Sequence, residues 1–198
     1  MIQLGYGFSN REITSFLEEA KGELNQDNNY LNPLESEYSQ ESNGLGPIYL
    51  RYHFRYQKHF SLGLILAYCD YTASSTHSYK RDINSGQGNQ PFYETISKTS
   101  KNYTFGVRWD FHLLNENRID PYIGIAGGYN LNYVRNQWET NDPAYSSSQP
   151  IISEGLEDPL YLAASLGIRF YPLQMIGIYA ELCFDRWSYF QGGLVFKF

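Results

Sequence analysis

Apolar and polar side chains alternate along the C-terminal segment from Met175 to Phe198. From Ile176 the even-numbered positions are Ile, Ile, Ala, Leu and Phe, and the odd-numbered positions that follow them are Gly, Tyr, Glu, Cys and Asp. After a short connection at 185–186 the alternation resumes and ends on an aromatic residue. A period of two over about ten residues, repeated in adjacent segments, is typical of membrane-spanning β-strands. The pattern therefore predicts a closing hairpin that has one apolar face.

The same alternation recurs in six further segments. In each of them bulky aliphatic and aromatic residues share one face, and Gly, Ala, Ser and charged residues share the other. The segments cover about 2–8, 47–56, 60–69, 103–113, 122–133 and 160–171. Long and short connections alternate between them until the final pair, as in an up-and-down barrel. We therefore predict an all-β fold over 1–198 as a single domain, an eight-stranded antiparallel up-and-down transmembrane β-barrel.

Three long polar connections, at about 10–46, 73–101 and 136–158, are predicted to be external loops. The first is acidic and places apolar residues at helical spacing, so we expect it to contain a short amphipathic helix. The apolar positions of this helix are Ile13, Phe16, Leu17, Ala20 and Leu24. The pattern gives no sign of strands that project beyond the barrel as a rigid sheet. The fourth external connection, at 185–186, is short and predicts a low rim.

A soluble barrel such as a lipocalin shows the same period with its apolar face inward. Here the apolar face carries bulky residues on every strand, and the interior of an eight-stranded barrel has room for few of them. The opposite face is rich in Gly, Ala and Ser, which suits a crowded lumen. No run approaches the ~18 consecutive apolar residues of a membrane-spanning helix. We therefore expect lipid outside and the polar face within.

The chain ends with the sequence FQGGLVFKF, in which Phe190, Leu194, Phe196 and Phe198 share one face. In this ending and in its whole architecture the chain resembles small outer-membrane barrels of the OmpA transmembrane-domain and OmpX type. The resemblance implies a location in a Gram-negative outer membrane, with periplasmic termini and extracellular loops. It also implies contact with outer-membrane lipids and recognition of the C-terminal residues by the barrel assembly machinery. We expect the natural precursor to carry an export signal and Met1 to be an added start residue.

Charged residues of both signs fall on the face predicted to line the lumen. Arg51, Arg108, Asp110 and Glu181 lie at similar depth from the nearest turn, and Arg169 belongs to the same face. Since unpaired charges in a dry interior are unfavourable, we predict a paired layer that closes the bore. A gated, narrow channel in which Glu181 exchanges partners is the alternative. The net charge of −6 argues against nucleic-acid binding.

Three other residue groups raise the question of chemistry. His53 and His112 lack the carboxylate or thiol partners of a metal site, so we predict no metal and no cofactor. Cys69 and Cys183 fall on strands predicted to lie on opposite sides of the barrel, too far apart for a disulfide. His77 has Ser75, Ser78 and Asp82 nearby, and outer-membrane lipid A deacylases and palmitoyltransferases use such residue types.

No motif of those enzymes transfers to His77 and its neighbours, so we assign no catalytic residue. We expect a non-enzymatic structural, adhesion or complex-accessory protein that acts through its external loops. The amphipathic helix is expected to cover the barrel mouth, or else to dock on a partner such as another outer-membrane protein. A lipid-modifying enzyme, either a lipid A acyl hydrolase or a transferase, and a narrow channel remain the alternatives.

Overall fold

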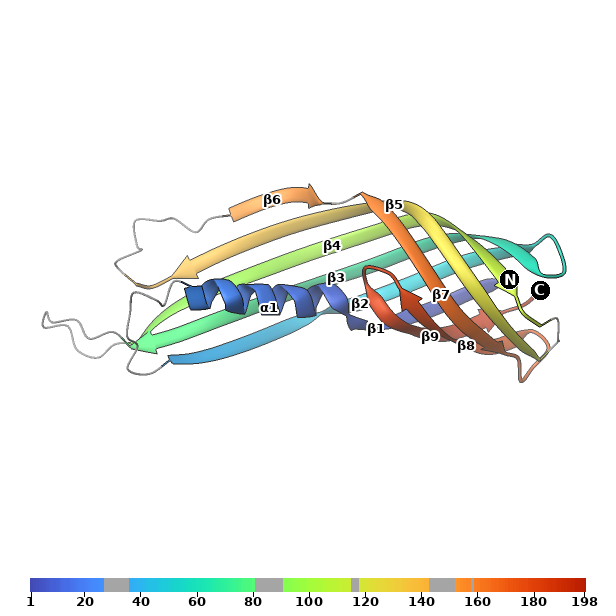
Figure 1. The fold of residues 1–198 in the computed structure, drawn as a ribbon, viewed down its shortest axis with the longest axis horizontal. Coiled ribbons are helices and arrows are strands. Elements are labelled where there is room, and N and C mark those ends of the chain that lie inside the picture. The colour runs from blue at the N-terminus through green and yellow to red at the C-terminus, as the bar shows by residue number, and fades with distance from the viewer. Residues whose placement is uncertain (27–35, 81–90, 115–117, 143–151, 158) are drawn as a thin grey trace, which may run out of the picture.

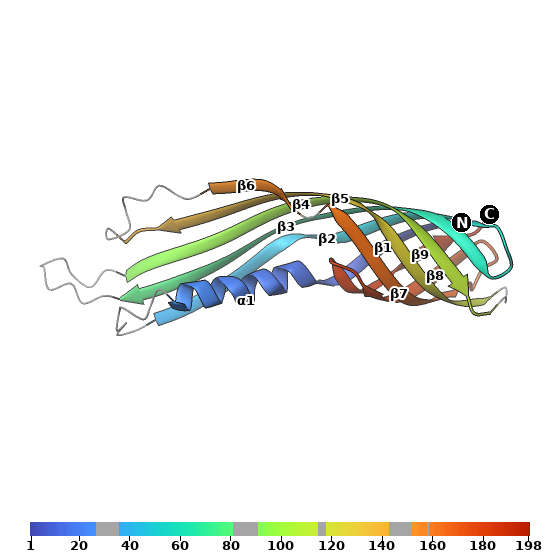
Figure 2. The same ribbon diagram turned by 45° about the horizontal axis from the view of Figure 1, so that its top comes forward.

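The chain forms a closed β-barrel from which one side continues as a long curved sheet (Figures 1 and 2). The computed structural model describes residues 1–26, 36–80, 91–114, 118–142, 152–157 and 159–198. Both termini lie together at one end of the barrel, and the sheet projects from the other end (Figure 1). The elements in chain order are β1 (Ile2–Asn10), α1 (Arg11–Gln26), β2 (Ser36–Arg55), β3 (Phe60–Lys80), β4 (Pro91–His112), β5 (Ile119–Thr140), β6 (Ile152–Glu157), β7 (Leu160–Phe170), β8 (Ile176–Phe184) and β9 (Ser188–Phe196).

Eight of the described strands close the barrel, and every pairing is antiparallel. Closure joins the first strand to the last, since Ile2 of β1 pairs with Phe196 of β9. The predicted eight-stranded up-and-down barrel with one short helix is confirmed. β6 is additional, because it pairs with the part of β5 that has already left the barrel. It covers the β5 edge of the projecting sheet.

The strands differ in length by a factor of about two, and this difference creates the projecting sheet. β2, β3, β4 and β5 have 20, 21, 22 and 22 residues, whereas β1, β7, β8 and β9 have 9, 11, 9 and 9. The part beyond the barrel, which we call the sheet extension, consists of residues 36–45, 70–80, 91–101 and 134–140 together with β6. Opposite it the barrel rim is low, as the short connection at 185–186 predicts.

The extension corrects the prediction that 10–46, 73–101 and 136–158 are loops. Much of these segments is paired strand, from Ser36–Tyr79 between β2 and β3 to Asn136–Ser153 between β5 and β6. The sequence pattern missed it because the outward positions change from apolar to polar beyond Tyr68. Without apolar residues on one side, the period of two is no longer visible.

Side chains of the barrel strands alternate between a buried inner face and an exposed outer face. On β8, Glu181 is 1% exposed, whereas its neighbour Leu182 is 56% exposed. The outward-facing apolar residues form a band around the whole barrel, which we call the outer belt. It includes Leu4, Tyr6 and Phe8 on β1, Leu45, Leu50 and Tyr52 on β2, Leu62, Leu64 and Leu66 on β3, Phe105, Trp109 and Phe111 on β4, Ile123, Ile125 and Tyr129 on β5, Leu162, Leu166 and Ile168 on β7, Ile178, Leu182 and Phe184 on β8, and Phe190 and Leu194 on β9.

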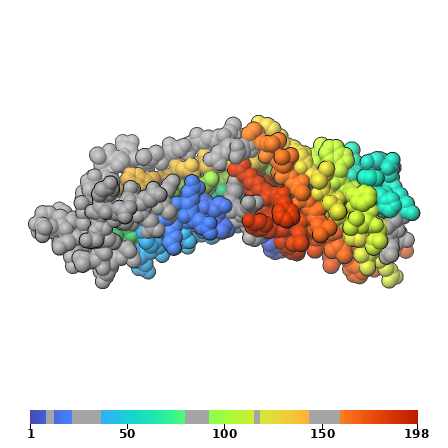
Figure 3. Space-filling model, viewed as in Figure 1, coloured from blue at the N-terminus to red at the C-terminus, as the bar shows by residue number. Residues whose placement is uncertain are grey.

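Helix α1 lies on the inner face of the sheet extension, the face that continues the barrel lumen (Figure 3). Its apolar residues recur every three or four positions, so they form one stripe. Ile13, Phe16 and Leu17 pack against a buried cluster on β3 made of Cys69, Tyr71 and Ala73. Ala20 is also buried, while the side chain of Leu24 lies outside the described residues. No helix in the described part of the chain is long and apolar enough to cross a membrane.

Candidate functional site

The interior of the barrel is filled by an ion-pair network that consists of Arg51, Arg108, Arg169, Asp110, Asp120 and Glu181. Strands β2, β4, β5, β7 and β8 contribute these residues, and each lies at an inward position of its strand. Each member is at most 3% exposed. Because three guanidinium groups face three carboxylates, the formal charges of the network balance.

Glu181 bridges two arginines on opposite walls. Its Oε2 accepts a hydrogen bond from Arg51 Nη1 at 2.5 Å, and its Oε1 pairs with Arg108 Nη2. The same Nη2 donates to Ser165 Oγ at 2.9 Å. Both carboxylate oxygens are therefore engaged, so Glu181 ties β2, β4 and β7 together across the bore.

Asp110 and Asp120 continue the network toward the end that carries the termini. Asp110 accepts from Arg108 Nε and from Arg169 Nη2, both at 2.5 Å. Asp120 pairs with Arg169 Nη1 at 3.1 Å and with His112 Nδ1 at 2.6 Å. Arg169 also lies 3.7 Å from the centroid of the Tyr122 ring, a cation–π contact.

The structure thus brings together all five residues of the predicted charge layer, and it adds Asp120. The sequence interpretation began the fifth strand at Tyr122, because Pro121 and the preceding turn hid the earlier part. Asp120 stands two positions before Tyr122 on the same face, so extending the alternation identifies it. Of the two histidines, His112 pairs with Asp120, and His53 Nδ1 lies 3.2 Å from Asp110 Oδ2.

An aromatic plug lies next to the network, on the side of the sheet extension. Trp187, from the short connection between β8 and β9, is 1% exposed. Trp187 belongs to a buried cluster with Tyr49, Ile65, Ala126 and Tyr161. The bore is therefore filled by an aromatic cluster and then by ion pairs. The sequence gave no signal for the plug, since a lone Trp in a turn has no periodic partner.

Asp185 was expected among the lumen charges, but it makes no printed pair with an arginine and instead holds the turn that presents Trp187. Its Oδ1 accepts the backbone N–H groups of Trp187 at 2.8 Å and of Ser188 at 2.7 Å. Its Oδ2 accepts from Tyr49 Oη at 3.0 Å and from Gln191 Nε2 at 2.9 Å. Four hydrogen bonds satisfy the carboxylate, and they fix the position of the plug.

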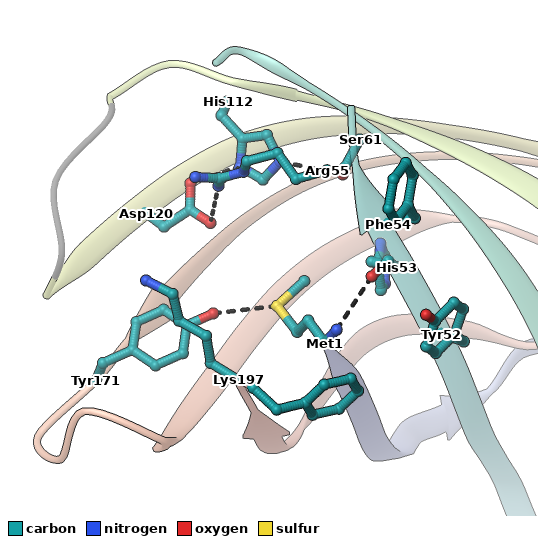
Figure 4. A pocket seen from close by; sticks show the side chains of 11 residues that line it. Met1, Tyr52, His53, Phe54, Arg55, Ser61, His112, Asp120, Tyr171 and Lys197 are labelled. Atoms are coloured by element: carbon teal, nitrogen blue, oxygen red, sulfur yellow. Dashed lines mark hydrogen bonds and ion pairs between the residues drawn. The ribbon is translucent and has the colours of Figure 1, made fainter. Parts of the chain in front are cut away.

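A cavity of about 390 Å³ opens at the end that carries both termini (Figure 4). Arg55 and Lys197, also expected in the lumen, line it. Arg55 Nη2 reaches Asp120 Oδ2 at 3.3 Å, although 40% of its side chain is exposed. Lys197 Nζ lies 5.7 Å from the centroid of the Tyr171 ring. His112 and Asp120 also line the cavity, so it ends against the ion-pair network.

A polar patch on the inner face of β4 and β5 was not predicted. Ser100 Oγ donates to Asn132 Oδ1 at 2.9 Å and accepts from Asn102 Nδ2 at 2.9 Å. Thr104 Oγ1 donates to Asn130 Oδ1 at 3.0 Å. All five side chains are at most 3% exposed. Their short polar side chains leave room beside α1, which packs on the neighbouring strand β3.

The candidate catalytic residues around His77 lie in the sheet extension. His77 faces inward and is fully buried, with its ring stacked on Tyr38 at 4.4 Å between centroids. Burial lowers the pKa of His77 below its usual value. Ser75 shares this face, but its Oγ makes no hydrogen bond within the described part of the chain. Ser78 points to the other face, and Asp82 lies outside the described residues.

The remaining predicted positions are placed as follows. The C-terminal residues Phe190, Leu194 and Phe198 are 40%, 47% and 73% exposed, and Phe196 is half-buried. Cys69 and Cys183 are both buried free thiols. In the described segments, no group of three or more His, Cys, Asp or Glu side chains is arranged to hold a metal ion.

Comparison with models of known protein families gives no match to this chain, and comparison with curated protein sequences gives none either.

Replacing Glu181 with Gln is expected to lower the free energy of unfolding by about 3–5 kcal/mol. The reason is that Arg51 and Arg108 lose their shared counter-charge inside a dry interior. Urea unfolding of the folded protein measures the effect. Glu41→Gln is the matched control, since Glu41 is exposed on the sheet extension, and it is expected to change the value by less than about 0.5 kcal/mol. Equal effects of the two substitutions would contradict a stabilising role for the network.

The double closure of the bore predicts that the protein does not conduct ions in planar bilayers. Trp187→Ala alone is also expected to stay silent, because the ion-pair network still fills the bore. The triple variant Arg51→Ala, Glu181→Ala, Trp187→Ala removes the plug and one balanced ion pair, and it is expected to conduct. Trp109→Ala, on the outer face, serves as the control. Steady conductance of the unaltered protein would contradict this account of the interior.

Proposed function

We propose that this chain is an integral outer-membrane barrel of a Gram-negative bacterium, of the small OmpA transmembrane-domain or OmpX type. In this proposal the barrel is an anchor with a closed interior. The protein acts without catalysis, through its sheet extension and α1, as a structural, adhesion or complex-accessory protein. Outer-membrane lipids surround the barrel, and the barrel assembly machinery recognises the C-terminal residues Phe190, Leu194, Phe196 and Phe198.

The observation that carries the proposal is the outer belt and the abrupt way in which it ends. On β3 the outward positions are Phe60, Leu62, Leu64, Leu66 and Tyr68, followed by Asp70, Thr72, Ser74 and Thr76. The strand itself continues without a break. A change of surface chemistry within one continuous strand indicates a change of solvent rather than a change of fold.

Neighbouring strands change at the corresponding level. Asp70 pairs in register with Lys101 of β4, and Lys101 pairs with Tyr133 of β5, two residues before Arg135. Beyond this level, outward threonines pair across the strands, with Thr72 Oγ1 and Thr99 Oγ1 3.2 Å apart. Thr76 Oγ1 and Thr95 Oγ1 form a second pair at 3.0 Å. This polar level supports a membrane boundary, with the sheet extension in water.

The direction of the chain gives the proposed orientation. Both termini and the short connections between β2 and β3 and between β7 and β8 lie at the end opposite the sheet extension (Figure 1). Outer-membrane barrels place short turns in the periplasm and long connections outside. We therefore place the termini in the periplasm, and the sheet extension and α1 at the cell surface.

Two features favour a non-enzymatic role. His77 lies seven residues beyond Asp70 on β3, about 20 Å along the strand at ~3.3 Å per residue. An ester bond at the membrane surface is out of reach of a side chain at that height, which argues against lipid A acyl hydrolysis or transfer at this position. The filled interior likewise argues against a channel.

Helix α1 supports the role of a cover more directly than the role of a docking element. Its apolar residues Ile13, Phe16 and Leu17 are already packed on β3, so they are not free for a partner. Glu18 and Glu19 are exposed on the opposite side. A partner that docks on α1 therefore meets an acidic surface.

Leu64→Arg is expected to disturb insertion of the barrel into lipid vesicles, with a loss of stability of about 2–4 kcal/mol. This is the range for a charge facing lipid near the middle of a membrane. Thr72→Arg is the matched control, since Thr72 lies on the same face of the same strand beyond the belt, and its effect is expected to be under about 1 kcal/mol. Folding yield in vesicles and urea unfolding measure both. Equal effects, or a chain that folds and stays soluble without detergent, would contradict the membrane location.

Two variants of α1 separate the cover from the docking role. Phe16→Ser with Leu17→Ser removes the packing and is expected to lower the Tm and expose α1 to protease, with a loss of about 1–3 kcal/mol. Glu18→Lys with Glu19→Lys changes only the exposed side, and it is expected to leave the Tm unchanged and to release proteins that co-purify from native membranes in mild detergent. Lys58→Glu, in a turn at the other end, is the control. Unchanged co-purification in the second variant would exclude α1 as a docking element.

A further inference from the structure

The barrel wall is incomplete between β1 and β2, on the side where the sheet extension begins. β1 remains paired with β9 as far as Asn10, which pairs with Ser188. With β2, however, its pairing ends at Tyr6 and Ile48. The next residue of β2, Pro47, has no backbone N–H to offer. A β-bulge between Leu45 and Ile48 then turns β2 away from its neighbour.

A side chain replaces the missing ladder bond. The backbone N–H of Gly46 donates to Tyr6 Oη at 3.2 Å. Glycine is required at this position, because a Cβ would lie 2.5 Å from that hydroxyl oxygen. Gly44 is also constrained, since a Cβ there would approach Asp70 O at 2.3 Å. The seam is thus held open by backbone geometry, and one tyrosine spans it.

A crevice of about 250 Å³ occupies this seam, and we call it the β1–β2 crevice. Its lining comes from both faces of the wall. Tyr6, Phe8 and Leu45 belong to the outer belt, whereas Tyr71 is a buried residue of the inner face. Ile13 of α1 also lines it. The crevice therefore connects the outer belt with the underside of the helix.

The chemistry of the lining selects an apolar ligand. Apart from three glycines, the lining residues are aromatic or aliphatic, and none of them is charged. The ring of Phe8 packs edge-on against Tyr6 at 5.3 Å and lies 5.7 Å from Phe190. The hydroxyl of Tyr6 already has a partner in Gly46. A hydrocarbon group meets no uncompensated polar group here, whereas an ion meets no counter-charge.

The size and position narrow the ligand further. Pockets for whole small molecules measure about 300–1,000 Å³, so this crevice suits a single chain rather than a headgroup. Leu45 pairs in register with Asp70, the first polar outward residue of β3. The crevice therefore opens at the level where the outer belt ends.

We propose that the β1–β2 crevice binds one acyl chain of an outer-leaflet lipid, which enters between Tyr6 and Leu45 and reaches Ile13 of α1. This proposal rests on the membrane location proposed above. Continuity of the crevice with the outer belt selects lipid as the occupant. The bound chain completes the wall where strand pairing stops, and it links the first turn of α1 to the membrane.

The test uses the full chain in vesicles of phosphatidylcholine that carries a photoreactive diazirine on one acyl chain. After illumination, peptide mass spectrometry locates the adducts. We expect adducts on outer-belt residues such as Leu64 and Leu166, and also on Ile13 and Tyr71. Leu45→Trp, which fills the crevice from outside, is expected to lower labelling of Ile13 and Tyr71 about tenfold, the loss that corresponds to ~1.4 kcal/mol of binding. Leu50→Trp, on the same strand and face, is the matched control and keeps it.

A second variant guards against misfolding of the first. Ile13→Trp fills the crevice from the helix, outside the barrel wall, and is expected to lower labelling of Tyr71 alone. Adducts on the belt without adducts on Ile13 and Tyr71, or labelling that neither filling variant reduces, would overturn the acyl-chain site. Absence of adducts from the belt itself would instead overturn the membrane location.

Discussion

Charge balance inside a bore too narrow for bulk water is the constraint on which this structure depends. Glu181, Asp110 and Asp120 face Arg51, Arg108 and Arg169 at distances that leave no gap between strands on opposite walls. A buried carboxylate that has lost its partner is strongly destabilising, whereas a complete set of pairs is tolerated. The strands therefore have to meet in one register, because sliding any of them by one residue turns its charge outward. The network acts as a lock on the register of the barrel as well as a filling for its interior.

The closed barrel could be predicted from the sequence because every barrel strand shows the same alternation. Bulky residues such as Leu64 and Phe105 face outward, and small or charged residues such as Gly63 and Thr104 face inward. The charge layer followed from the same alternation, since depth along neighbouring strands is set by the turns. Asp120 was missed only because Pro121 concealed where its strand begins.

The sheet extension and the plug could not be predicted in the same way, for different physical reasons. Beyond Tyr68 and Tyr103 both faces carry polar residues, so the period of two loses its contrast although the backbone pairing continues. Trp187 acts from a turn, where side-chain direction depends on the hydrogen bonds of Asp185 rather than on strand geometry. The β1–β2 crevice depends on where a ladder stops, which is a relation between strands and leaves no mark in either one alone.

The inner face is continuous from the ion-pair network to the sheet extension, and its character changes step by step along the way. Charged pairs around Glu181 give way to the aromatic cluster of Trp187, and then to hydroxyl and amide groups around Asn132. Helix α1 occupies the neighbouring part of the same face on β3. The helix thus replaces, above half of the barrel, the packing that the opposite wall supplies lower down.

The unequal strand lengths give the molecule a front and a back. On the side of β2 to β5 the wall rises far beyond the barrel, while on the side of β8 and β9 it stops at the short turn that carries Trp187. A neighbour that approaches the mouth from the tall side is turned away by the sheet, and one that approaches from the low side reaches α1 and the inner face directly. Any encounter at this end is therefore directional, so the angle at which the barrel stands among its neighbours decides which of them it meets.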